Sequence, residues 1–328
     1  MKKTLLAVLV TLIPLLSGAQ GMDPAARANF AKIFWRPTAK TVKLYENDGP
    51  VRSTPQKADF TEALLEIYSP REDENNGLCV IMCPGGGYAG ESQSYEGRDF
   101  APWFTSRGMT YCMLQYRLPN GNHTIPLSDA EAAMEYLRSH ADELGIRKIG
   151  IAGCSAGGHL ASTLATHYSS TRTRPDFQIL LYPVITMDET FTHQGSRDNL
   201  LGTNPSQELV DRYSNEKQVT KDTPEAFIVL ASDDFLVPVK NSTRYYEALV
   251  EKGVGATLLC YPTGNHGFGN NDTFKYRNNW LDELDTWIYK TLLKYSFSTL
   301  ASSFKPTQGG SHHHIGNRHP HIVCPPPA

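Results

Sequence analysis

A short glycine-rich motif contains the first residue suited to covalent catalysis. Residues 153–158 read Gly-Cys-Ser-Ala-Gly-Gly, a G-x-S-x-G pattern that follows an apolar run at 148–152 and precedes a helical pattern at 156–167. This strand–turn–helix context is what a nucleophile elbow requires, because the sharp turn lifts the central serine above the end of the strand. We predict that Ser155 is a nucleophile and that Cys154 packs beneath the turn. The alternative is a Gly-rich turn that only packs.

A second glycine-rich segment, Pro-Gly-Gly-Gly-Tyr at 84–88, follows the apolar run 78–83. Acyl transfer passes through an oxyanion that needs fixed N–H donors about 3 Å away, and glycines let the backbone approach a substrate carbonyl without side-chain clashes. We therefore expect the oxyanion donors to be the backbone N–H groups of Gly86, Gly87 and Ala156. A phosphate-binding loop is the alternative, but the segment lacks the G-K-[ST] ending of that motif.

A serine nucleophile needs a base, and the base needs an acid to orient it. His266 lies in a Gly-rich loop after the last apolar run, and it is the only histidine between Asp234 and residue 299. After an elbow of this kind the order along the chain is Ser, then Asp or Glu, then His, which makes His266 the expected base. Asp233 and Asp234 both follow an apolar run, and their spacing alone does not choose the acid.

Apolar runs alternate with helical patterns along most of the chain, which predicts an α/β fold with a mostly parallel sheet covered by helices on both faces. One helix is predicted over 129–144, with Ser128 as its N-cap and Gly145 at its end. Residues 183–224 depart from this rhythm and are expected to form a small cap or a wall over one edge of the site. The predicted strands are 42–45, 64–68, 78–83, 110–114, 148–152, 177–181, 227–231 and 257–261, and the further helices are 98–106, 156–167, 207–213, 239–252 and 279–293.

The N-terminal segment has the pattern of a secretory signal peptide. Lys2 and Lys3 precede an apolar stretch at 5–16, and small residues follow at 17–19. The apolar stretch is shorter than the roughly 20 residues that cross a bilayer. We therefore expect cleavage near Ala19, with residues 1–19 removed.

One globular domain is predicted over residues 22–298, and a different composition follows it. Residues 299–328 are rich in histidine and proline. Such a composition favours a flexible tail, and capture of a transition metal by its clustered imidazoles is the alternative.

Composition and charge exclude several partners. The chain is 40% hydrophobic and 20% charged, and its 31 Lys+Arg and 34 Asp+Glu give a net charge of −3. Such a balance provides no general attraction for nucleic acid or anionic lipid, so we expect no nucleic-acid partner and no membrane association after signal cleavage. The six cysteines do not indicate a disulfide framework, because Cys79 and Cys83 would lie too far apart along one strand. A cross-strand bridge that involves Cys112 is left open.

Several motifs together resemble exported bacterial α/β-hydrolases. They are PGGGY, YRLP at 116–119, PLSDA at 126–130, GCSAGGHLA, the stretch 193–202 and YPTGNHGFG. Over roughly residues 35–295 the chain is similar to acetylxylan esterases and feruloyl-esterase-like carbohydrate esterases, which are related to the hormone-sensitive-lipase group. The resemblance implies the α/β-hydrolase fold with an eight-stranded sheet. One departure is Pro84, which stands where related esterases often carry a histidine.

The resemblance also selects the acid. The run D-x-x-V-P that begins at Asp234 is similar to the acid turn of related hydrolases, which implies a triad of Ser155, Asp234 and His266. The predicted function is a secreted or periplasmic serine esterase that removes acetyl groups from plant polysaccharide, xylan above all, without a metal or an organic cofactor. Tyr88 and Phe268 are expected to line its substrate pocket.

Three alternatives to this function are kept. The chain is then a feruloyl esterase, a general carboxylesterase or exported peptidase of the same fold, or a non-catalytic binding protein on a hydrolase scaffold. A complete triad argues against the last of these, because such scaffolds commonly lose the serine or the histidine.

Overall fold

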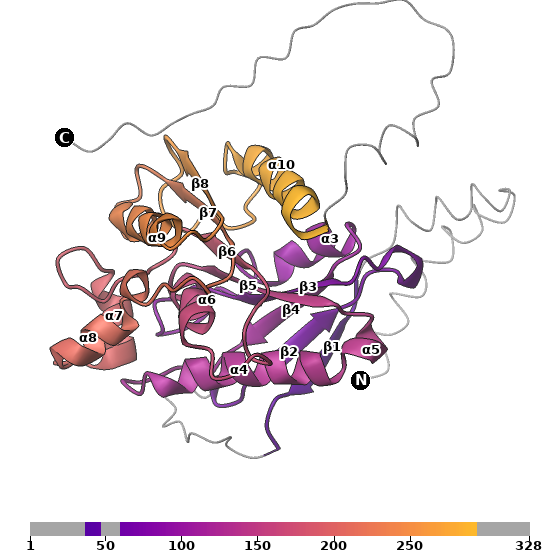
Figure 1. Cartoon of the computed structure of the whole chain (residues 1–328), viewed down its shortest axis with the longest axis horizontal. Helices are drawn as coiled ribbons and strands as arrows, with labels where there is room; N and C mark the ends of the chain where they lie inside the picture. The colour runs from indigo at the N-terminus through magenta and orange to yellow at the C-terminus, as the bar shows by residue number, and fades with distance from the viewer. Residues whose placement is uncertain (1–36, 47–59, 294–328) are drawn as a thin grey trace, which may run out of the picture. The chain divides into compact units, whose positions relative to one another are not determined.

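Figure 1 shows the computed structural model, which describes residues 37–46 and 60–293. The described helices and strands all belong to the unit that begins at Ala39. The expected signal segment 1–19 and the tail 299–328 lie outside the described residues. Within the described part of the chain, no helix is both long and apolar enough to cross a membrane.

The described strands form one eight-stranded mixed sheet, in the order β1-β2-β4-β3-β5-β6-β7-β8. The pairs β1–β2 and β2–β4 are antiparallel, and every other neighbouring pair is parallel. The mostly parallel sheet predicted from the sequence is therefore confirmed. The strands are β1 (Ala39–Lys43), β2 (Leu64–Tyr68), β3 (Leu78–Cys83), β4 (Thr110–Gln115), β5 (Lys148–Cys154), β6 (Gln178–Leu181), β7 (Ala226–Ala231) and β8 (Ala256–Tyr261).

Burial explains which strands the sequence located well. All residues of β3 are buried, and alternate side chains enter the cores on the two faces of the sheet. A strand covered on both faces reads as an unbroken apolar run, which is why its predicted bounds are those observed. β1 is the contrasting case, because it is an edge strand with mostly exposed residues. Because β1 has no buried apolar pattern, the strand predicted at 42–45 is displaced from the observed one.

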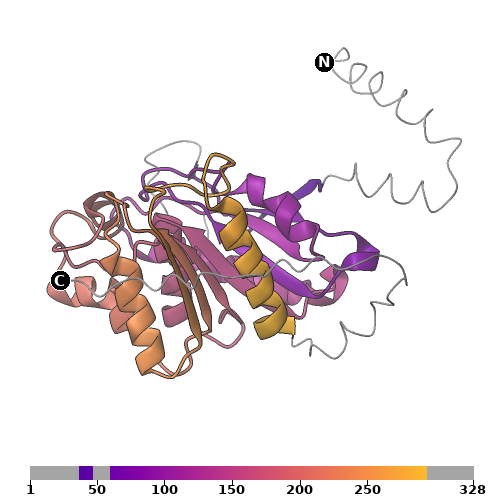
Figure 2. The same cartoon turned by 90° about the horizontal axis from the view of Figure 1, so that it is seen from above.

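Helices cover both faces of the sheet, as Figures 1 and 2 show. On one face α4, α6 and α9 contribute Leu137, Leu160 and Leu249 to one core. On the other face α3 and α10 contribute Phe104 and Trp280 to a second core. The helices are α3 (Ala101–Thr105), α4 (Thr124–Ser139), α5 (Ala141–Leu144), α6 (Ala156–His167), α7 (Gln194–Leu201), α8 (Gln207–Tyr213), α9 (Lys240–Glu251) and α10 (Arg277–Trp287), with 3-10 turns η2 (Glu72–Glu74), η3 (Arg98–Phe100) and η4 (Asn215–Lys217) and a terminal π-helical turn η5 (Ile288–Leu293).

The start of α4 corrects one prediction. Ser128 was expected to cap a helix that begins at residue 129, but it lies inside α4 and its hydroxyl donates to the Ile125 carbonyl oxygen at 2.7 Å. The helix begins at Thr124, whose backbone N–H donates to the Asn122 side chain at 3.3 Å. A polar side chain just before the first turn can satisfy one of the N–H groups that lack an intrahelical partner. Gly145, with φ 63°, ends the region as predicted.

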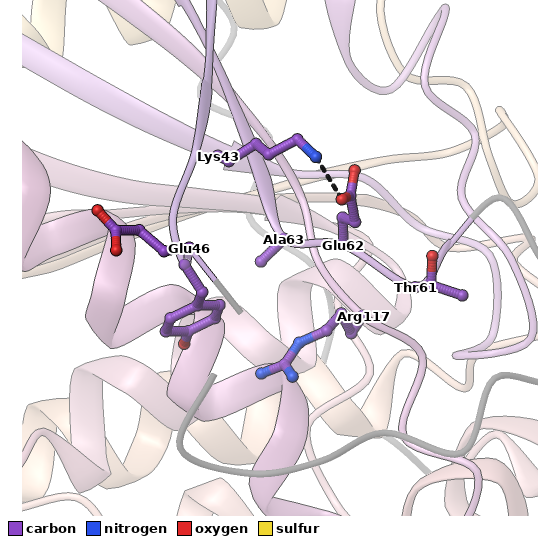
Figure 3. A pocket seen from close by; sticks show the side chains of 7 residues that line it. Lys43, Glu46, Thr61, Glu62, Ala63 and Arg117 are labelled. Carbon is purple, nitrogen blue, oxygen red and sulfur yellow. Dashed lines mark hydrogen bonds and ion pairs between the residues drawn. The ribbon is translucent and has the colours of Figure 1, made fainter. Parts of the chain in front are cut away.

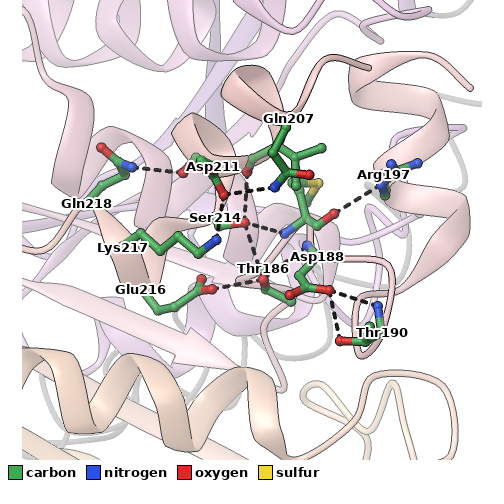
Figure 4. A network of polar contacts seen from close by, with 12 residues as sticks. Thr186, Asp188, Thr190, Arg197, Gln207, Asp211, Ser214, Glu216, Lys217 and Gln218 are labelled. Atoms are coloured by element: carbon green, nitrogen blue, oxygen red, sulfur yellow. Dashed lines mark hydrogen bonds and ion pairs between the residues drawn. The ribbon is translucent and has the colours of Figure 1, made fainter. Parts of the chain in front are cut away.

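Residues 183–224, which we call the cap segment, contain α7, α8 and η4, and Figure 4 shows a network of polar contacts among these residues. The Ser214 hydroxyl accepts from the Met187 backbone N–H at 3.0 Å, and the Thr186 hydroxyl donates to Glu216 at 2.9 Å. These bonds tie the chain that leaves β6 to the end of α8. The cap segment is thus held in place by buried polar contacts as well as by packing.

The described cysteines are all free thiols. The Cys79 and Cys112 sulfur atoms are 3.8 Å apart, far longer than the roughly 2.05 Å of a disulfide bond, so the cross-strand bridge left open by the sequence is not formed. Cys154 is buried directly before Ser155, and burial raises the pKa of its thiol well above the usual value. The prediction that Cys154 packs beneath the turn is confirmed.

A buried ion pair fixes the chain that follows β4 to α4. The guanidinium of Arg117 contacts the Asp129 carboxylate, whose other oxygen accepts from the Arg117 backbone N–H at 2.7 Å. Both side chains are nearly inaccessible, at 1% and 0% exposure. Burial raises the pKa of Asp129, and the hydrogen bonds and charge of Arg117 oppose this rise.

We expect Asp129→Asn to lower the free energy of unfolding by about 3–5 kcal/mol, because it removes the charge of the carboxylate that pairs with the buried guanidinium. Glu135→Gln is the matched control, since Glu135 pairs with Arg172 at 2.7 Å on an exposed surface and such pairs contribute about 0–1 kcal/mol. Denaturant unfolding of the three proteins measures both effects. Equal losses in the two variants would contradict the special role of the buried pair.

Candidate active site

Ser155 occupies a sharp turn between β5 and α6. Its backbone has φ 53° and ψ −119°, a strained region for a residue with a side chain. The turn closes tightly, because a Cβ on Gly157 would lie 2.0 Å from the Cys83 carbonyl oxygen and one on Gly153 would lie 2.1 Å from the Gly157 carbonyl oxygen. Only glycine fits at these positions. The turn therefore has the geometry expected of a nucleophile elbow.

The structure brings the three residues of the predicted triad together. His266 Nε2 lies 2.8 Å from Ser155 Oγ, and His266 Nδ1 lies 2.7 Å from Asp234 Oδ2. Ser155 follows β5, Asp234 follows β7 and His266 follows β8, so all three stand at the carboxyl ends of parallel strands. Such an arrangement lets the imidazole take a proton from the serine while the carboxylate holds its orientation.

The choice between the two neighbouring aspartates is made by hydrogen bonds. The second oxygen of Asp234, Oδ1, accepts from the backbone N–H groups of Leu236 and Val237 at 3.0 and 2.9 Å. Its side chain is only 1% exposed. Asp233 is exposed and accepts instead from the Asn265 backbone N–H at 2.7 Å. Asp234 thus contacts the imidazole, whereas Asp233 supports the loop that carries it.

The loop after β3 presents backbone N–H groups beside Ser155. Gly86 and Gly87 have φ 144° and 64° and line the same cavity as Ser155. Within the described part of the chain, the backbone N–H groups of Gly86 and Gly87 have no hydrogen-bond partner. Ala156 is the first residue of α6, where a backbone N–H also lacks an intrahelical partner. These three backbone N–H groups therefore remain the candidate oxyanion donors.

Side chains from distant segments hold this oxyanion loop. The Tyr116 hydroxyl donates to the Pro84 carbonyl oxygen at 2.8 Å, and the Asn199 amide donates to the Gly87 carbonyl oxygen at 2.8 Å. Pro84 occupies the place where related esterases often carry a histidine, so the loop is fixed here through its carbonyl groups. Asn199 belongs to α7 and lines the cavity beside Ser155, so the cap segment contributes residues to the wall of this cavity.

A cavity of about 360 Å³ opens beside the triad. Several residues that line it had no functional role in the sequence analysis. One of them is His193, and the available signal for it is its place in the stretch 193–202 that carries part of the resemblance. The lining residues are Gly86, Gly87, Ala89, Ser92, Tyr95, Glu96, Ser155, His193, Gly195, Asn199, Leu236, His266 and Gly267.

The two aromatic residues predicted to line the cavity do not do so. Tyr88 is 1% exposed, and its hydroxyl lies 2.9 Å from Nδ1 of the buried His159. Phe268 is 5% exposed and stacks on Phe274 with ring centroids 4.1 Å apart. Both rings pack into the protein core, where they remove more apolar surface from water than they would at a cavity wall. The predicted substrate contacts of Tyr88 and Phe268 are therefore wrong.

Burial keeps the histidines around the site neutral. Desolvation, and then the neighbouring His266, lower the pKa of His193, while Asp234 opposes the change. Desolvation lowers the pKa of the fully buried His159 to about 4. Both imidazoles therefore act as neutral hydrogen-bonding groups. Among the described residues, no cluster of His, Cys, Asp and Glu could hold a metal ion.

A second hollow of about 260 Å³ lies between β1, β2 and the chain after β4 (Figure 3). Lys43 and Glu62 form an ion pair across it, and Arg117 points toward it. The residues that line it include no serine, cysteine or histidine. The nucleophile–base–acid geometry is therefore found in the first cavity.

Comparison with known proteins identifies the family of the chain that carries this site. The family model BD-FAE matches residues 65–249, which is more than half of the chain. The chain belongs to the BD-FAE family. The matched region includes the oxyanion loop, Ser155 and Asp234 and ends before His266, so the structure adds the base to the BD-FAE match.

Three individual proteins illustrate the similarity of this BD-FAE chain. An acetylxylan esterase of Xylanibacter ruminicola is 40% identical over 237 residues, which are 70% of this chain and 49% of that protein. The structure of an acetyl ester-xyloside bifunctional hydrolase from Caldicellulosiruptor lactoaceticus superposes with a TM-score of 0.71 at 33% identity, covering 78% of this chain and 98% of that one. An α/β hydrolase from a Medee basin deep-sea metagenome library has a TM-score of 0.60 at 24% identity, with 78% and 98% covered.

These similarities and the sheet order confirm the predicted fold. The chain has the α/β-hydrolase fold, with an eight-stranded, mostly parallel sheet flanked by helices. The chain spans about half the length of the acetylxylan esterase that it matches.

We expect Asp234→Asn to slow phosphonylation of Ser155 by a fluorophosphonate probe about 10⁴-fold, because the amide favours the wrong imidazole tautomer. Asp233→Asn is the matched control one residue away and should change the rate only a few-fold, since Asp233 contacts a backbone N–H. Labelling rates measured by intact-protein mass spectrometry distinguish the two. A larger loss in Asp233→Asn would overturn the assignment of Asp234.

Proposed function

We propose that the protein is an exported serine esterase that removes acetyl groups from plant polysaccharide, with acetylated xylan as the principal substrate. The observation that carries this proposal is the chain of hydrogen bonds from Asp234 through His266 to Ser155 at the edge of a cavity lined by free backbone donors. The acetylxylan esterase and the acetyl ester-xyloside hydrolase among its relatives support the choice of acyl group and polymer.

The proposed reaction has two acyl-transfer steps. Ser155 Oγ attacks the ester carbonyl while His266 Nε2 takes its proton, and the resulting oxyanion is held by the N–H groups of Gly86, Gly87 and Ala156. His266 then gives the proton to the leaving sugar hydroxyl. Water attacks the acyl-serine by the same route, which releases acetate and restores the serine. Asp234 keeps its charge throughout and stabilises the imidazolium.

An exposed apolar edge beside the triad supports a carbohydrate substrate. Four large apolar side chains are exposed among the described residues, and two of them, Phe235 at 81% and Leu236 at 41%, directly follow Asp234. Leu236 also lines the cavity. A sugar ring has an apolar C–H face that packs against an aromatic ring, and its hydroxyls match polar lining groups such as Asn199. Phe235 is then the platform for a pyranose ring of the polymer.

Export is part of the proposal. The support is the sequence pattern of residues 1–19, with Lys2 and Lys3 before an apolar stretch and small residues. Acetylated xylan is a polymer that does not enter cells intact, so an enzyme that acts on it works in the periplasm or outside the cell.

We expect the mature protein to release acetate from acetylated xylan and Ser155→Ala to lose this activity by about 10⁶-fold in kcat, because the nucleophile is removed. Acetate and ferulate released from acetylxylan and from feruloylated arabinoxylan are quantified side by side. Ferulate without acetate would replace the acetyl substrate by a feruloyl one. Hydrolysis of only small acetyl esters would refute the polysaccharide substrate.

We expect Phe235→Ala to lower kcat/KM on acetylated xylan about tenfold while kcat/KM on 4-nitrophenyl acetate stays within twofold. One lost aromatic contact of this kind accounts for about 1.4 kcal/mol, which is a factor of ten. Val250→Ala is the matched control, because Val250 is also exposed, at 52%, but lies on α9. A parallel loss on both substrates would contradict a sugar platform.

A further inference from the structure

A buried carboxylate lies between the oxyanion loop and the loop that carries His266. Glu96 is 2% exposed, and it belongs to the chain between β3 and η3. Its Oε2 accepts from the Gly85 backbone N–H at 3.0 Å, and its Oε1 accepts from the Tyr182 hydroxyl at 2.7 Å. The same hydroxyl accepts from the Gly269 backbone N–H at 2.9 Å. Three segments that are distant in the sequence, namely the loop after β3, the end of β6 and the loop after β8, are thereby joined by one hydrogen-bonded network.

Two residues of this hydrogen-bonded network, Tyr182 and Glu96, also interact with the proposed catalytic base His266. The ring of Tyr182 packs edge-to-face on the imidazole of His266, with centroids 4.8 Å apart. Glu96 and His266 line the same cavity and interact electrostatically. The carboxylate of Glu96 is therefore the second negative group, beside Asp234, that faces the imidazole.

The groups around His266 leave the carboxylate of Glu96 as a charge that can act on the imidazole. Desolvation raises the pKa of Glu96, whereas its hydrogen bond from Tyr182 and the charge of His266 lower it. His193 is held neutral by its lowered pKa and adds no positive charge. The titratable groups that face His266 are Asp234 from the loop after β7, Glu96 and Tyr95 from the loop after β3, Tyr182 from the end of β6 and His193 from the start of α7.

We propose that Glu96 is a positioning residue that fixes the oxyanion loop relative to His266 and stabilises the imidazolium formed in each acyl-transfer step. Glu96 takes up no proton in the reaction. The proton moves only between Ser155, His266 and the leaving or attacking hydroxyl. This inference rests on the proposed serine-esterase chemistry but not on the identity of the polymer.

The same loop offers a matched control. Glu91 also has a raised pKa, about 8, because of its burial. Its Oε1 accepts from the Tyr116 backbone N–H at 2.8 Å and its Oε2 accepts from the Gln93 amide at 2.9 Å. Glu91 does not line the cavity. Glu91→Gln therefore removes a half-buried acid from the same loop without removing the group that faces His266.

The test compares Glu96→Gln, Glu91→Gln and Tyr182→Phe on 4-nitrophenyl acetate, with thermal unfolding as the check on folding. Glu96→Gln preserves side-chain size and removes the charge. We expect its kcat to fall about tenfold with KM within twofold, and the acidic limb of its kcat/KM profile to move about one pH unit lower, because an imidazolium without this anion loses its proton more readily. Glu91→Gln should change neither quantity.

Tyr182→Phe removes the hydroxyl that links Glu96 to the Gly269 backbone N–H. We expect a fall in kcat of about tenfold, and a double variant with Glu96→Gln should lose less than the product of the two single effects, since both act through one network. Multiplicative losses would overturn the shared network.

An unmoved acidic limb in Glu96→Gln, a kcat within threefold of the parent, or an equal loss in Glu91→Gln would overturn the role of Glu96. Phosphonylation rates of Ser155, measured as a function of pH in the same variants, separate this result from failure of the proposed function. If the parent protein hydrolyses no ester, the proposed function fails. An acidic limb of phosphonylation that moves in Glu96→Gln alone would still support the positioning role, and one that stays in place would overturn it.

Discussion

The strained turn at Ser155 requires glycine two residues before it and two residues after it. Ser155 has φ 53°, and its neighbours Gly153 and Gly157 leave no room for a Cβ against the backbone around them. The cost of such a conformation is of order 1–3 kcal/mol and is sustained by the packing around it. β3, β5 and α6 supply that packing. The base, the acid and the oxyanion donors are all arranged about this fixed oxygen.

The parallel sheet determines how the other groups reach the nucleophile. β3, β5, β6, β7 and β8 are neighbours with the same direction, so the loops at their carboxyl ends meet at one edge. One loop carries the oxyanion donors, a second carries Asp234 and a third carries His266. The chain that leaves β6 brings Tyr182, and its cap segment closes one wall with Asn199. Residues with no local relation are thereby held within hydrogen-bonding distance.

Errors in the sequence interpretation share a physical origin. Tyr88 lies next to the oxyanion loop and Phe268 next to the base, so both were reasonable candidates for the cavity wall, yet both rings turn into the core. Ser128 has the residue pattern of a helix cap, but the helix already begins at Thr124 and the Ser128 hydroxyl donates to the Ile125 carbonyl oxygen within it. In each case the sequence identified a residue near the site or the helix start. The residue's side chain, however, contacts a group that the local sequence pattern does not reveal. Side-chain direction depends on such partners.

The sequence by itself predicted the groups for the proposed chemistry and determined the order of the elements. Glycine spacing, apolar periodicity and chain order are local properties, and they sufficed for the elbow at Ser155, for the base His266 and for nearly all strands. Residue spacing alone left Asp233 and Asp234 open and the resemblance selected Asp234, which the tertiary structure brings to the imidazole; only the tertiary structure placed His193 at the cavity and joined Glu96 to Tyr182. These outcomes depend on which non-local groups meet in a buried site. A buried polar group must form its hydrogen bonds with the groups that packing places beside it.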